Sequence, residues 1–235
     1  MKDHRFPSAF FITGTDTGVG KTIVAATLVR ALSGAYFKPV QSGLDTVTDT
    51  ETVKAITGLP DSHFFPETYR LTLPLSPHLA ARMDHVSISV EDMRLPDYRP
   101  FPHLIVEGAG GVMAPLNDTQ FILDLMVRLD IPVLLVARSG LGTINHTLLS
   151  LNMMRQNGLK VFGVVMNGPL NPGNKEAIEH FGKVAVIAEI PPVEMRSPDP
   201  IATLFHHFFK DDKGDGCFPN CPRGNESPIQ PDPPI

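Results

Sequence analysis

The stretch FITGTDTGVGKT, residues 11–22, decides the fold, because it joins an apolar strand to a glycine-rich turn and a helix start. Residues 9–12 predict a buried strand, and residues 23–29 predict a helix. Backbone N–H groups of such a turn converge at the helix start, where the helix dipole favours negative charge. The Lys21 ammonium would reach the terminal phosphates of a nucleotide, and the Thr22 hydroxyl would bind Mg²⁺. The segment therefore predicts a phosphate-binding loop.

The loop is one residue longer than the common form. Residues 15–19 lie between Gly14 and Gly20, where the usual pattern has about four residues. A glycine-rich turn followed by a chance Lys-Thr pair is the alternative interpretation. That alternative does not explain why a strand precedes the turn and a helix follows it, so a nucleotide site is the stronger prediction.

Composition excludes several classes of function. The chain has 235 residues, which is enough for one sizeable α/β domain. Its net charge is −5, which does not imply a basic surface for nucleic acid. Its apolar runs are shorter than the roughly 18 residues of a membrane span, and residues 1–7 contain no signal-peptide core. We therefore expect a cytoplasmic protein with no nucleic-acid or membrane partner.

Apolar runs of strand length alternate with longer helical patterns along the chain. Continuous runs such as residues 104–106 and 133–136 indicate strands buried on both faces. The alternation predicts an α/β fold of the P-loop NTPase type, with three layers and helices on both faces of a mostly parallel sheet. We expect strands at 9–13, 35–40, 103–107, 132–137, 160–166 and 184–190, and helices at 21–32, 50–57, 120–129, 144–157, 174–181 and 200–209.

Residues 1–210 are expected to form a single domain. The interval 58–102 is rich in proline and predicts loops with one short helix near 78–83. Residues 211–235 are polar and dense in proline, which predicts a disordered tail. Both cysteines, Cys217 and Cys221, lie in this tail, and two ligands alone do not make a structural zinc site.

A second motif, LIVEGAGG at residues 104–111, ends an apolar strand with an acid and a glycine run. In nucleoside triphosphatases an acid at the end of a neighbouring strand helps to hold Mg²⁺, and Glu107 fits that role. Asp49 is a further candidate metal ligand, although it could equally be a helix N-cap. Asp45 and Glu51 compete with Asp49 for the role.

Lys38 lies near the end of a buried strand, in YFKPVQSG at residues 36–43. A lysine there is energetically costly unless it meets an anion. A second cation beside Lys21 is what phosphoryl transfer requires, because negative charge spreads over the phosphoryl oxygens in the transition state. The alternative is a solvent-exposed lysine on an edge strand.

Together these motifs resemble the dethiobiotin synthetase family, ATP-dependent enzymes of biotin synthesis. The resemblance covers residues 9–192, and its motifs occur in the family's order. They are GTDTGVGKT at 14–22, KPVQSG at 38–43, SPH at 76–78, VEGAGG at 106–111, GTINH at 142–146, Asn167 after a strand, and EIP at 189–191.

The resemblance implies a three-stage reaction that uses ATP and Mg²⁺. Diaminopelargonic acid takes up CO₂ as a carbamate on one amine, and ATP phosphorylates that carbamate. The second amine then closes the cyclic urea of dethiobiotin and releases phosphate. Lys21, Lys38 and Mg²⁺ would neutralise the repulsion between the anionic carbamate and the triphosphate.

The resemblance also implies roles for individual residues. Lys38 matches the catalytic lysine, and Thr17 and Ser42 match contacts to the reacting end of the substrate. Thr22, Asp49 and Glu107 match the metal ligands, which favours Asp49 over its two competitors. Asn167 and Gly168 match the adenine site. Further nucleotide contacts are expected from Gly18, Val19, Gly20, Ile23, Gly108, Ala109, Gly110, Pro191, Pro192 and Val193, and further substrate contacts from Gly111 and Val112.

A helix start at residues 142–146 offers a second anion site through its exposed N–H groups. In the family this helix start comes from the partner subunit and holds the distal carboxylate of the substrate, so the resemblance implies a homodimer. An ordinary loop-to-helix entry is the alternative. The residues implied as substrate contacts are Gly142, Thr143, Ile144 and Asn145.

Two departures and three rival interpretations qualify the assignment. Gly18 stands where many family members have Glu, and the interval between Ser42 and Asp49 is short. A partition- or septum-type switch ATPase would have a second, signature lysine where this chain has Asp16. A glutamine-dependent synthetase would need a further domain with a nucleophilic cysteine. A catalytically dead binding module would not be expected to keep both Lys21 and Lys38.

Overall fold

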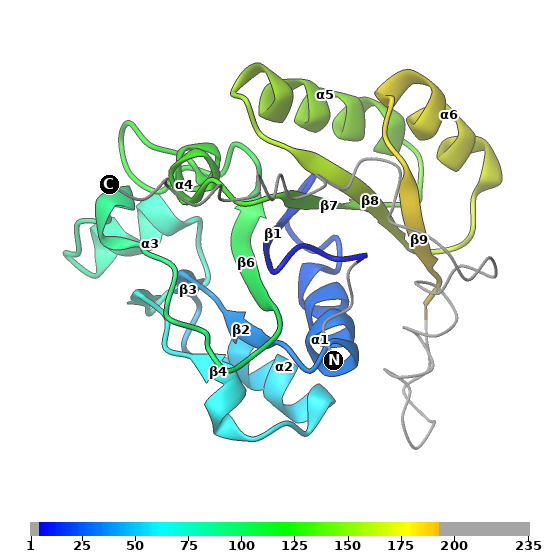
Figure 1. Ribbon diagram of the computed structural model, residues 1–235. Helices are drawn as coiled ribbons and strands as arrows, with labels where there is room; N and C mark the ends of the chain where they lie inside the picture. The colour runs from blue at the N-terminus through cyan, green and yellow to red at the C-terminus, as the bar shows by residue number, and fades with distance from the viewer. Residues whose placement is uncertain (1–4, 193–235) are drawn as a thin grey trace, which may run out of the picture.

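A seven-stranded sheet organises residues 5–192, the part of the chain that the computed structural model describes (Figure 1). Every strand pairing in this sheet is parallel, and β1 and β6 lie near its centre. The strand order is β4-β2-β6-β1-β7-β8-β9. The bounds are β1 Ala9–Gly14, β2 Ala35–Phe37, β4 Phe64–Phe65, β6 Leu104–Gly111, β7 Val133–Arg138, β8 Val161–Asn167 and β9 Val186–Ile190.

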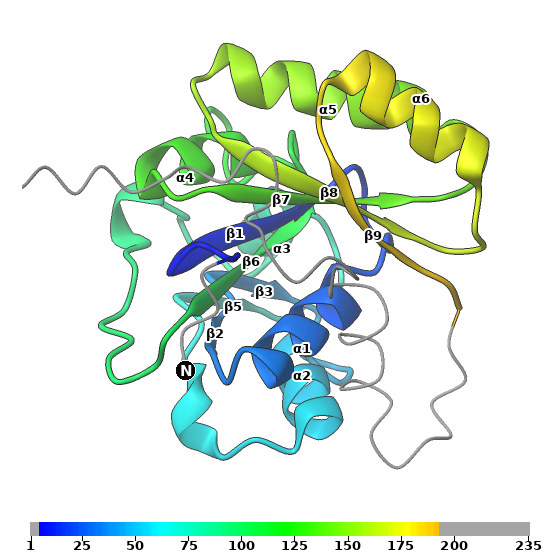
Figure 2. The ribbon, with the colours of Figure 1, turned by 45° about the vertical axis from the view of Figure 1, so that its right-hand side comes forward.

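Helices cover both faces of the sheet (Figure 2). One apolar cluster joins Phe10 and Ile12 of β1 to α1 and α2, and the other joins Phe11 to α4, α5 and α6. Successive residues of β1 thus enter opposite layers, as the alternation of a strand requires. This confirms the predicted α/β fold of three layers. The helices are α1 Lys21–Ala31, α2 Asp49–Thr57, α3 Pro77–Met83, α4 Ile122–Leu129, α5 Thr143–Gln156 and α6 Pro172–Gly182.

The predicted strand at residues 35–40 is wrong in one respect, because the structure divides it in two. β2 ends at Phe37, and β3 (Val40–Ser42) pairs with β5 (Tyr69–Leu71) in a separate two-stranded sheet. Pro39 has no N–H to continue the ladder, so the chain leaves the main sheet there. The break leaves Lys38 and Pro39 between the two strands, and the Lys38 side chain is buried there.

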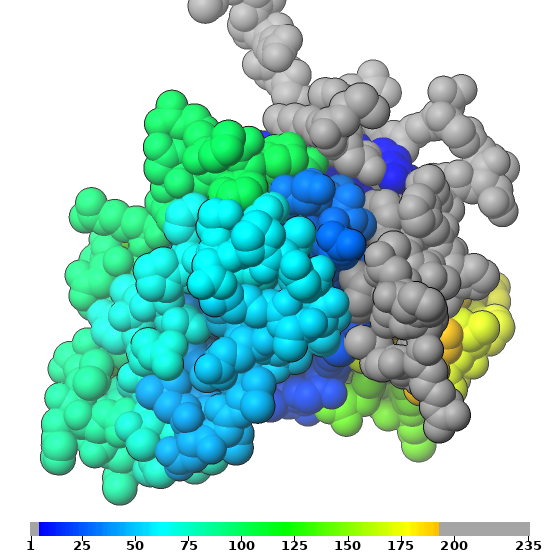
Figure 3. Space-filling view, turned by 90° about the horizontal axis from the view of Figure 1, so that it is seen from below, coloured from blue at the N-terminus to red at the C-terminus, as the bar shows by residue number. Residues whose placement is uncertain are grey.

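The interval 58–102 has more regular structure than the sequence indicates. The predicted short helix is present as α3, but β4, β5 and two 3₁₀ turns, Asp61–His63 and Val90–Asp92, were not predicted. These strands are only two or three residues long, too short for a periodic pattern to reveal. Figure 3 shows that α2 and the cyan segment after it form the outer surface on this side.

Some predictions lie outside the described residues. These are the helix at 200–209, Val193, the tail at 211–235 and its two cysteines. None of the helices between residues 5 and 192 combines the length and the apolar character that crossing a membrane requires.

Candidate nucleotide and metal site

The loop after β1 has the backbone shape of an anion cradle. Gly18 has φ of 70° and Gly20 has φ of 96°, values in the left-handed region that favours glycine. Space also requires glycine at position 20, because a Cβ there would lie 1.9 Å from Asn167 Nδ2. α1 begins directly after Gly20, so its free N–H groups open onto the loop.

Lys21 folds back over the loop. Its Nζ donates to the Asp16 carbonyl oxygen at 3.1 Å, and its side chain is almost fully buried. Burial, assisted by the nearby Lys38 ammonium, lowers the pKa of Lys21 to about 8. A buried cation that lacks a full counter-charge favours the arrival of an anion.

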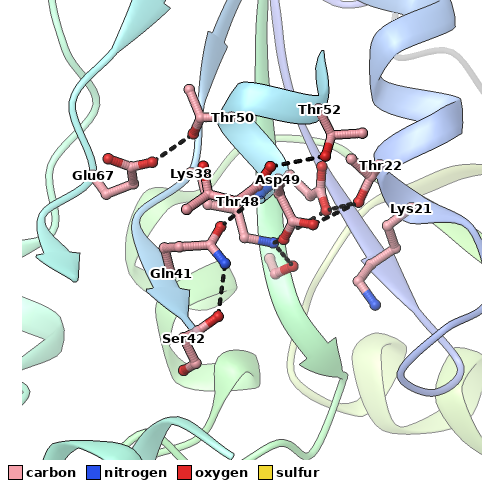
Figure 4. Close-up of polar contacts among 12 residues, drawn as sticks. Lys21, Thr22, Lys38, Gln41, Ser42, Thr48, Asp49, Thr50, Thr52 and Glu67 are labelled. Atoms are coloured by element: carbon pink, nitrogen blue, oxygen red, sulfur yellow. Dashed lines mark hydrogen bonds and ion pairs between the residues drawn. The ribbon is translucent and has the colours of Figure 1, made fainter. Parts of the chain in front are cut away.

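Three oxygen-bearing side chains from distant parts of the chain meet beside this lysine (Figure 4). Thr22 Oγ1 lies 3.0 Å from Asp49 Oδ1 and 3.0 Å from Glu107 Oε1. Thr22 belongs to α1, Asp49 begins α2, and Glu107 lies on β6. The structure therefore brings together the three residues expected to be metal ligands.

Lys38 joins the two carboxylates. Its Nζ lies 2.5 Å from Asp49 Oδ2 and 3.1 Å from Glu107 Oε1, and it also donates to the Gly108 carbonyl at 3.2 Å. Burial alone would lower the pKa of Lys38, but Glu107 and Asp49 outweigh burial and raise it. Burial likewise opposes ionisation of Asp49, yet Lys38 and Thr22 lower its pKa below the usual value. Lys38 and Asp49 thus form a buried ion pair rather than two neutral groups.

A helix cap explains why Asp49, and neither competitor, reaches the cluster. Thr48 caps α2, and Glu51 closes the capping box by accepting from the Thr48 N–H at 2.8 Å. Asp45 is exposed on the preceding loop. The Gln41 side chain accepts from the Asp49 N–H at 3.1 Å and donates to the Ser42 carbonyl at 2.8 Å, which ties α2 to β3.

A cavity of about 670 Å³ lies over these groups. Ser42 borders it, and the Ser42 hydroxyl is buried without a hydrogen-bond partner. An unpartnered buried hydroxyl at a cavity wall is suited to bind a polar ligand. The expected site residues that line the cavity are Thr17, Gly18, Gly20, Lys21, Thr22, Ile23, Lys38, Ser42, Asp49, Glu107, Ala109 and Gly110.

Several expected site residues lie outside this cavity. Val19 is buried in the core, and Gly108 packs so tightly that a Cβ would lie 2.6 Å from the Phe11 ring. Asn167 donates to the Val19 carbonyl at 3.0 Å, and the Gly168 N–H donates to the Ile190 carbonyl, just before Pro191 and Pro192. The expected adenine residues thus lie together behind the loop.

The expected substrate residues divide between two places. Gly111 and Val112 border a second cavity of about 510 Å³, which shares Thr17 with the first. Gly142, Thr143, Ile144 and Asn145 lie at the start of α5, where Gly142 and Asn145 are exposed and Thr143 is buried, and they line neither of these two cavities. Within a single chain, residues 142–145 therefore do not line the cavity that contains Lys38.

Sequence reasoning missed two partners of the site. The Tyr36 hydroxyl donates to Glu107 Oε2 at 2.9 Å, and burial raises the pKa of Tyr36 well above its usual value. Arg138 forms an ion pair at 2.7 Å with Asp16 of the loop. Tyr36 precedes Lys38 by two residues, and this spacing along an extended segment was the available signal.

Comparisons with known proteins identify the family. A family model described as an AAA domain matches residues 8–198. The ATP-dependent dethiobiotin synthetase BioD of Paramagnetospirillum magneticum is 47% identical over 194 residues, covering 83% of this chain and 93% of that protein. The same-named protein of Brucella ovis is 45% identical over 202 residues, covering 86% and 92%.

The chain also resembles part of a longer protein. The biotin biosynthesis bifunctional protein BioCD of Bordetella avium is 46% identical over 192 residues, which cover 81% of this chain but only 41% of that protein. Among solved structures, a ParA family ATPase from Chlorobium tepidum is 14% identical with a TM-score of 0.46, covering 80% of this chain and 85% of that one. That likeness is too low to bear on function. By its closer relatives and its family model, the chain belongs to the family of ATP-dependent dethiobiotin synthetases.

Proposed function

We propose that the protein catalyses the ATP- and Mg²⁺-dependent carboxylation and ring closure of 7,8-diaminopelargonic acid with CO₂, giving dethiobiotin, ADP and phosphate. The observation that carries this proposal is the convergence of Lys21, Lys38, Thr22 and two carboxylates at one cavity. Family membership supplies the substrate, and the cavity supplies the chemistry that the substrate needs.

The donor set fits a magnesium ion. Thr22, Asp49 and Glu107 offer only oxygen atoms, which Mg²⁺ prefers. Between residues 5 and 192, no three His, Cys, Asp or Glu side chains gather closely enough to hold a metal ion by themselves. Phosphate oxygens and water would complete the ligand set. Bound there, the ion would neutralise charge on the β- and γ-phosphates.

Carbamate formation comes first in this proposal: one amine of the substrate adds to the carbon of CO₂ and loses a proton. Phosphoryl transfer is the second step. One carbamate oxygen attacks the γ-phosphorus of ATP, the bond to the β-phosphate oxygen breaks, and ADP leaves. Lys21 binds the terminal phosphates, and Lys38 lies between them and the carbamate, where it stabilises the charge of both. Thr17 and the unpartnered Ser42 hydroxyl hold the reacting end of the substrate in line.

Ring closure follows without a second nucleotide. The free amine attacks the carbonyl carbon of the carbamic–phosphoric anhydride, the C–O bond to phosphate breaks, and a proton leaves the attacking nitrogen. The product is the cyclic urea. Lys38 is well placed to stabilise the departing phosphate, because its ammonium remains charged in the buried network.

The nucleotide base is proposed to lie against Asn167, Gly168, Pro191 and Pro192, with Val193 beyond the described residues. In support, the Asn167 amide is already aimed at the loop, 3.0 Å from the Val19 carbonyl. Gly168 has φ of 134°, which lets the chain turn away from the end of β8.

A homodimer is part of the proposal. In support, Gly142 and Asn145 are exposed at the start of α5, where helix N–H groups suit a carboxylate, yet residues 142–145 do not line the cavity of their own chain. Leu141, beside it, is fully exposed. In the proposed dimer, residues 142–145 of one subunit hold the distal carboxylate of the substrate bound to the other.

The direct test measures ADP release from ATP and Mg²⁺, with and without diaminopelargonic acid and bicarbonate. We expect release to depend strongly on the diamine and to accompany a product with the mass of the cyclic urea. Hydrolysis that is independent of the diamine would instead favour a switch ATPase. An absence of hydrolysis under both conditions would contradict the proposed reaction.

A further inference from the structure

A buried tyrosine, Tyr36, donates a hydrogen bond to Glu107, one of the proposed metal-binding carboxylates. The Tyr36 hydroxyl lies 2.9 Å from Glu107 Oε2, and both side chains are excluded from solvent, with exposures of 0% and 1%. Neither the sequence motifs nor the family resemblance gives Tyr36 a role. Its contact is nevertheless made directly to the carboxylate at the centre of the site.

The two oxygens of Glu107 have different partners. Oε1 accepts from Thr22 and from Lys38, on the cavity side. Oε2 accepts from Tyr36, in the interior. A carboxylate with both oxygens bound in this way has one defined orientation, with a single oxygen directed at the cavity.

The backbone and the core determine where the Tyr36 hydroxyl lies. Tyr36 pairs with Ile105 in the register between β2 and β6, two residues before Glu107. Its ring packs at 6.2 Å against the Phe64 ring and belongs to the apolar cluster beneath α1. Strand pairing therefore fixes the Tyr36 backbone and aromatic packing fixes its ring, and together they determine the position of the hydroxyl.

We propose that Tyr36 is a positioning residue for the metal-dependent step: it holds Glu107 so that Oε1 alone is presented to the divalent ion. The inference rests on the proposed function, because it assumes a metal ion at Thr22, Asp49 and Glu107. Hydrogen bonds to ligating carboxylates orient the ligand, and their loss typically weakens metal binding roughly 10- to 100-fold.

The test compares the wild-type protein with Tyr36→Phe, which keeps the ring and removes only the hydroxyl. Calorimetry measures the affinity for a non-hydrolysable ATP analogue, once with saturating Mn²⁺ and once in EDTA. The ratio of the affinity in Mn²⁺ to the affinity in EDTA reports how much the metal contributes to binding. We expect this ratio to fall roughly tenfold or more in Tyr36→Phe. The affinity in EDTA should change less than about twofold, because the hydroxyl that is removed bonds to Glu107 and not to the phosphate loop.

Tyr69→Phe is the matched control. The Tyr69 hydroxyl likewise donates to a carboxylate, Asp92 at 2.8 Å, and it accepts from the Ser89 N–H at 3.0 Å. It lies on β5, and neither of these partners is a proposed metal ligand. This variant should keep the wild-type ratio. Thermal unfolding of both variants establishes that they are folded under the conditions of the titration.

A further measurement separates positioning from general packing. In a Glu107→Gln background, Tyr36→Phe should change the ratio by less than about twofold, because the effect acts through the carboxylate. An unchanged ratio in Tyr36→Phe, or an equal loss in Mn²⁺ and in EDTA, would overturn the inference. A wild-type protein whose affinity is the same in Mn²⁺ and EDTA would overturn the proposed metal site itself, and Tyr36 with it.

Discussion

At the scale of single residues, the unusual feature is that Lys38 occupies the space between two proposed metal ligands. Lys38 contacts both Asp49 and Glu107, so a single ammonium is shared between two acidic side chains in a buried setting. A divalent ion placed among Thr22 and these carboxylates would take over much of their neutralisation. The lysine would then be free to meet the carbamate and the γ-phosphate.

Replacing Lys38 should separate catalysis from binding. Lys38→Ala is expected to lower the turnover number roughly 10²- to 10³-fold, because one preorganised cation is removed from the transition state. The affinity for ATP should stay within about threefold, since the phosphate loop is intact. Steady-state ADP release and calorimetry measure the two quantities.

Lys54→Ala is the control for the loss of a lysine charge. Lys54 pairs with Asp61 at 2.8 Å on the surface of α2, away from the cavity. Its removal should leave turnover near the wild-type value. Near-wild-type turnover in Lys38→Ala as well would refute the catalytic role.

The lowered pKa of Lys21 predicts a pH dependence for metal-free ATP binding. The charged ammonium binds phosphate, and in the free protein Lys21 loses its proton as the pH rises through about 8. Affinity in EDTA should therefore be level below pH 8 and fall above it, by at most about tenfold per pH unit, with uptake of a proton on binding. Calorimetry in buffers of different ionisation enthalpy measures both effects.

Lys21→Arg provides the matching control, because a guanidinium stays charged throughout this range. Its affinity, even if weaker overall, should not vary between pH 7.5 and 9.5 through loss of the side-chain charge. If the wild-type profile is as flat as that of Lys21→Arg, the assignment of phosphate binding to the Lys21 ammonium is wrong.

At the scale of elements, the start of α2 links local stability to the site. Thr48 and Glu51 form a capping box, and the next residue after Thr48 is Asp49. Thr48→Ala should cost about 1 kcal/mol of unfolding free energy and lower the melting temperature. It should also weaken Mn²⁺-dependent nucleotide binding, because Asp49 loses the cap that places it.

Asn171→Ala tests whether the second effect is specific. Asn171 caps α6 by accepting from the Asn174 N–H at 3.1 Å, far along the chain from the proposed metal ligands. The Asn171→Ala variant should lose a similar amount of unfolding free energy, and its nucleotide binding should keep the wild-type dependence on Mn²⁺. Equal metal dependence in Thr48→Ala and wild type would contradict the link.

At the scale of the whole molecule, the proposed dimer predicts complementation between two inactive variants. Asn145→Asp places a negative charge at the start of α5, which should repel the substrate carboxylate while suiting the helix dipole. Lys38→Ala inactivates the other part of the site. Random mixing of the two should restore about a quarter of wild-type activity, because half of the dimers then have one intact site.

Either variant alone, refolded or subunit-exchanged with itself, should remain inactive. Sedimentation measures the mass of the wild-type protein in parallel. A monomer in solution, or a mixture with no more activity than its components, would contradict a shared active site.

Much of the fold was predictable from the sequence, because local patterns encode it directly. A glycine-rich loop between a strand and a helix commonly binds phosphate. Continuous apolar runs indicate strands that are buried on both faces of a parallel sheet. Lys21 and Thr22 were predictable for the same reason, since they belong to a contiguous motif. The break after Phe37 was not predicted, although Pro39 provided the signal.

Sequence alone therefore determined the fold class, the phosphate loop and the types of side chain at the site. The residue pattern left Asp45, Asp49 and Glu51 open, and the resemblance favoured Asp49. The tertiary structure shows the physical reason, since a helix cap directs Asp49 toward Thr22. Only the tertiary structure placed Tyr36 on Glu107, a contact between residues 71 positions apart. The physical reason is that such contacts depend on strand pairing and packing between distant segments, which no local pattern specifies.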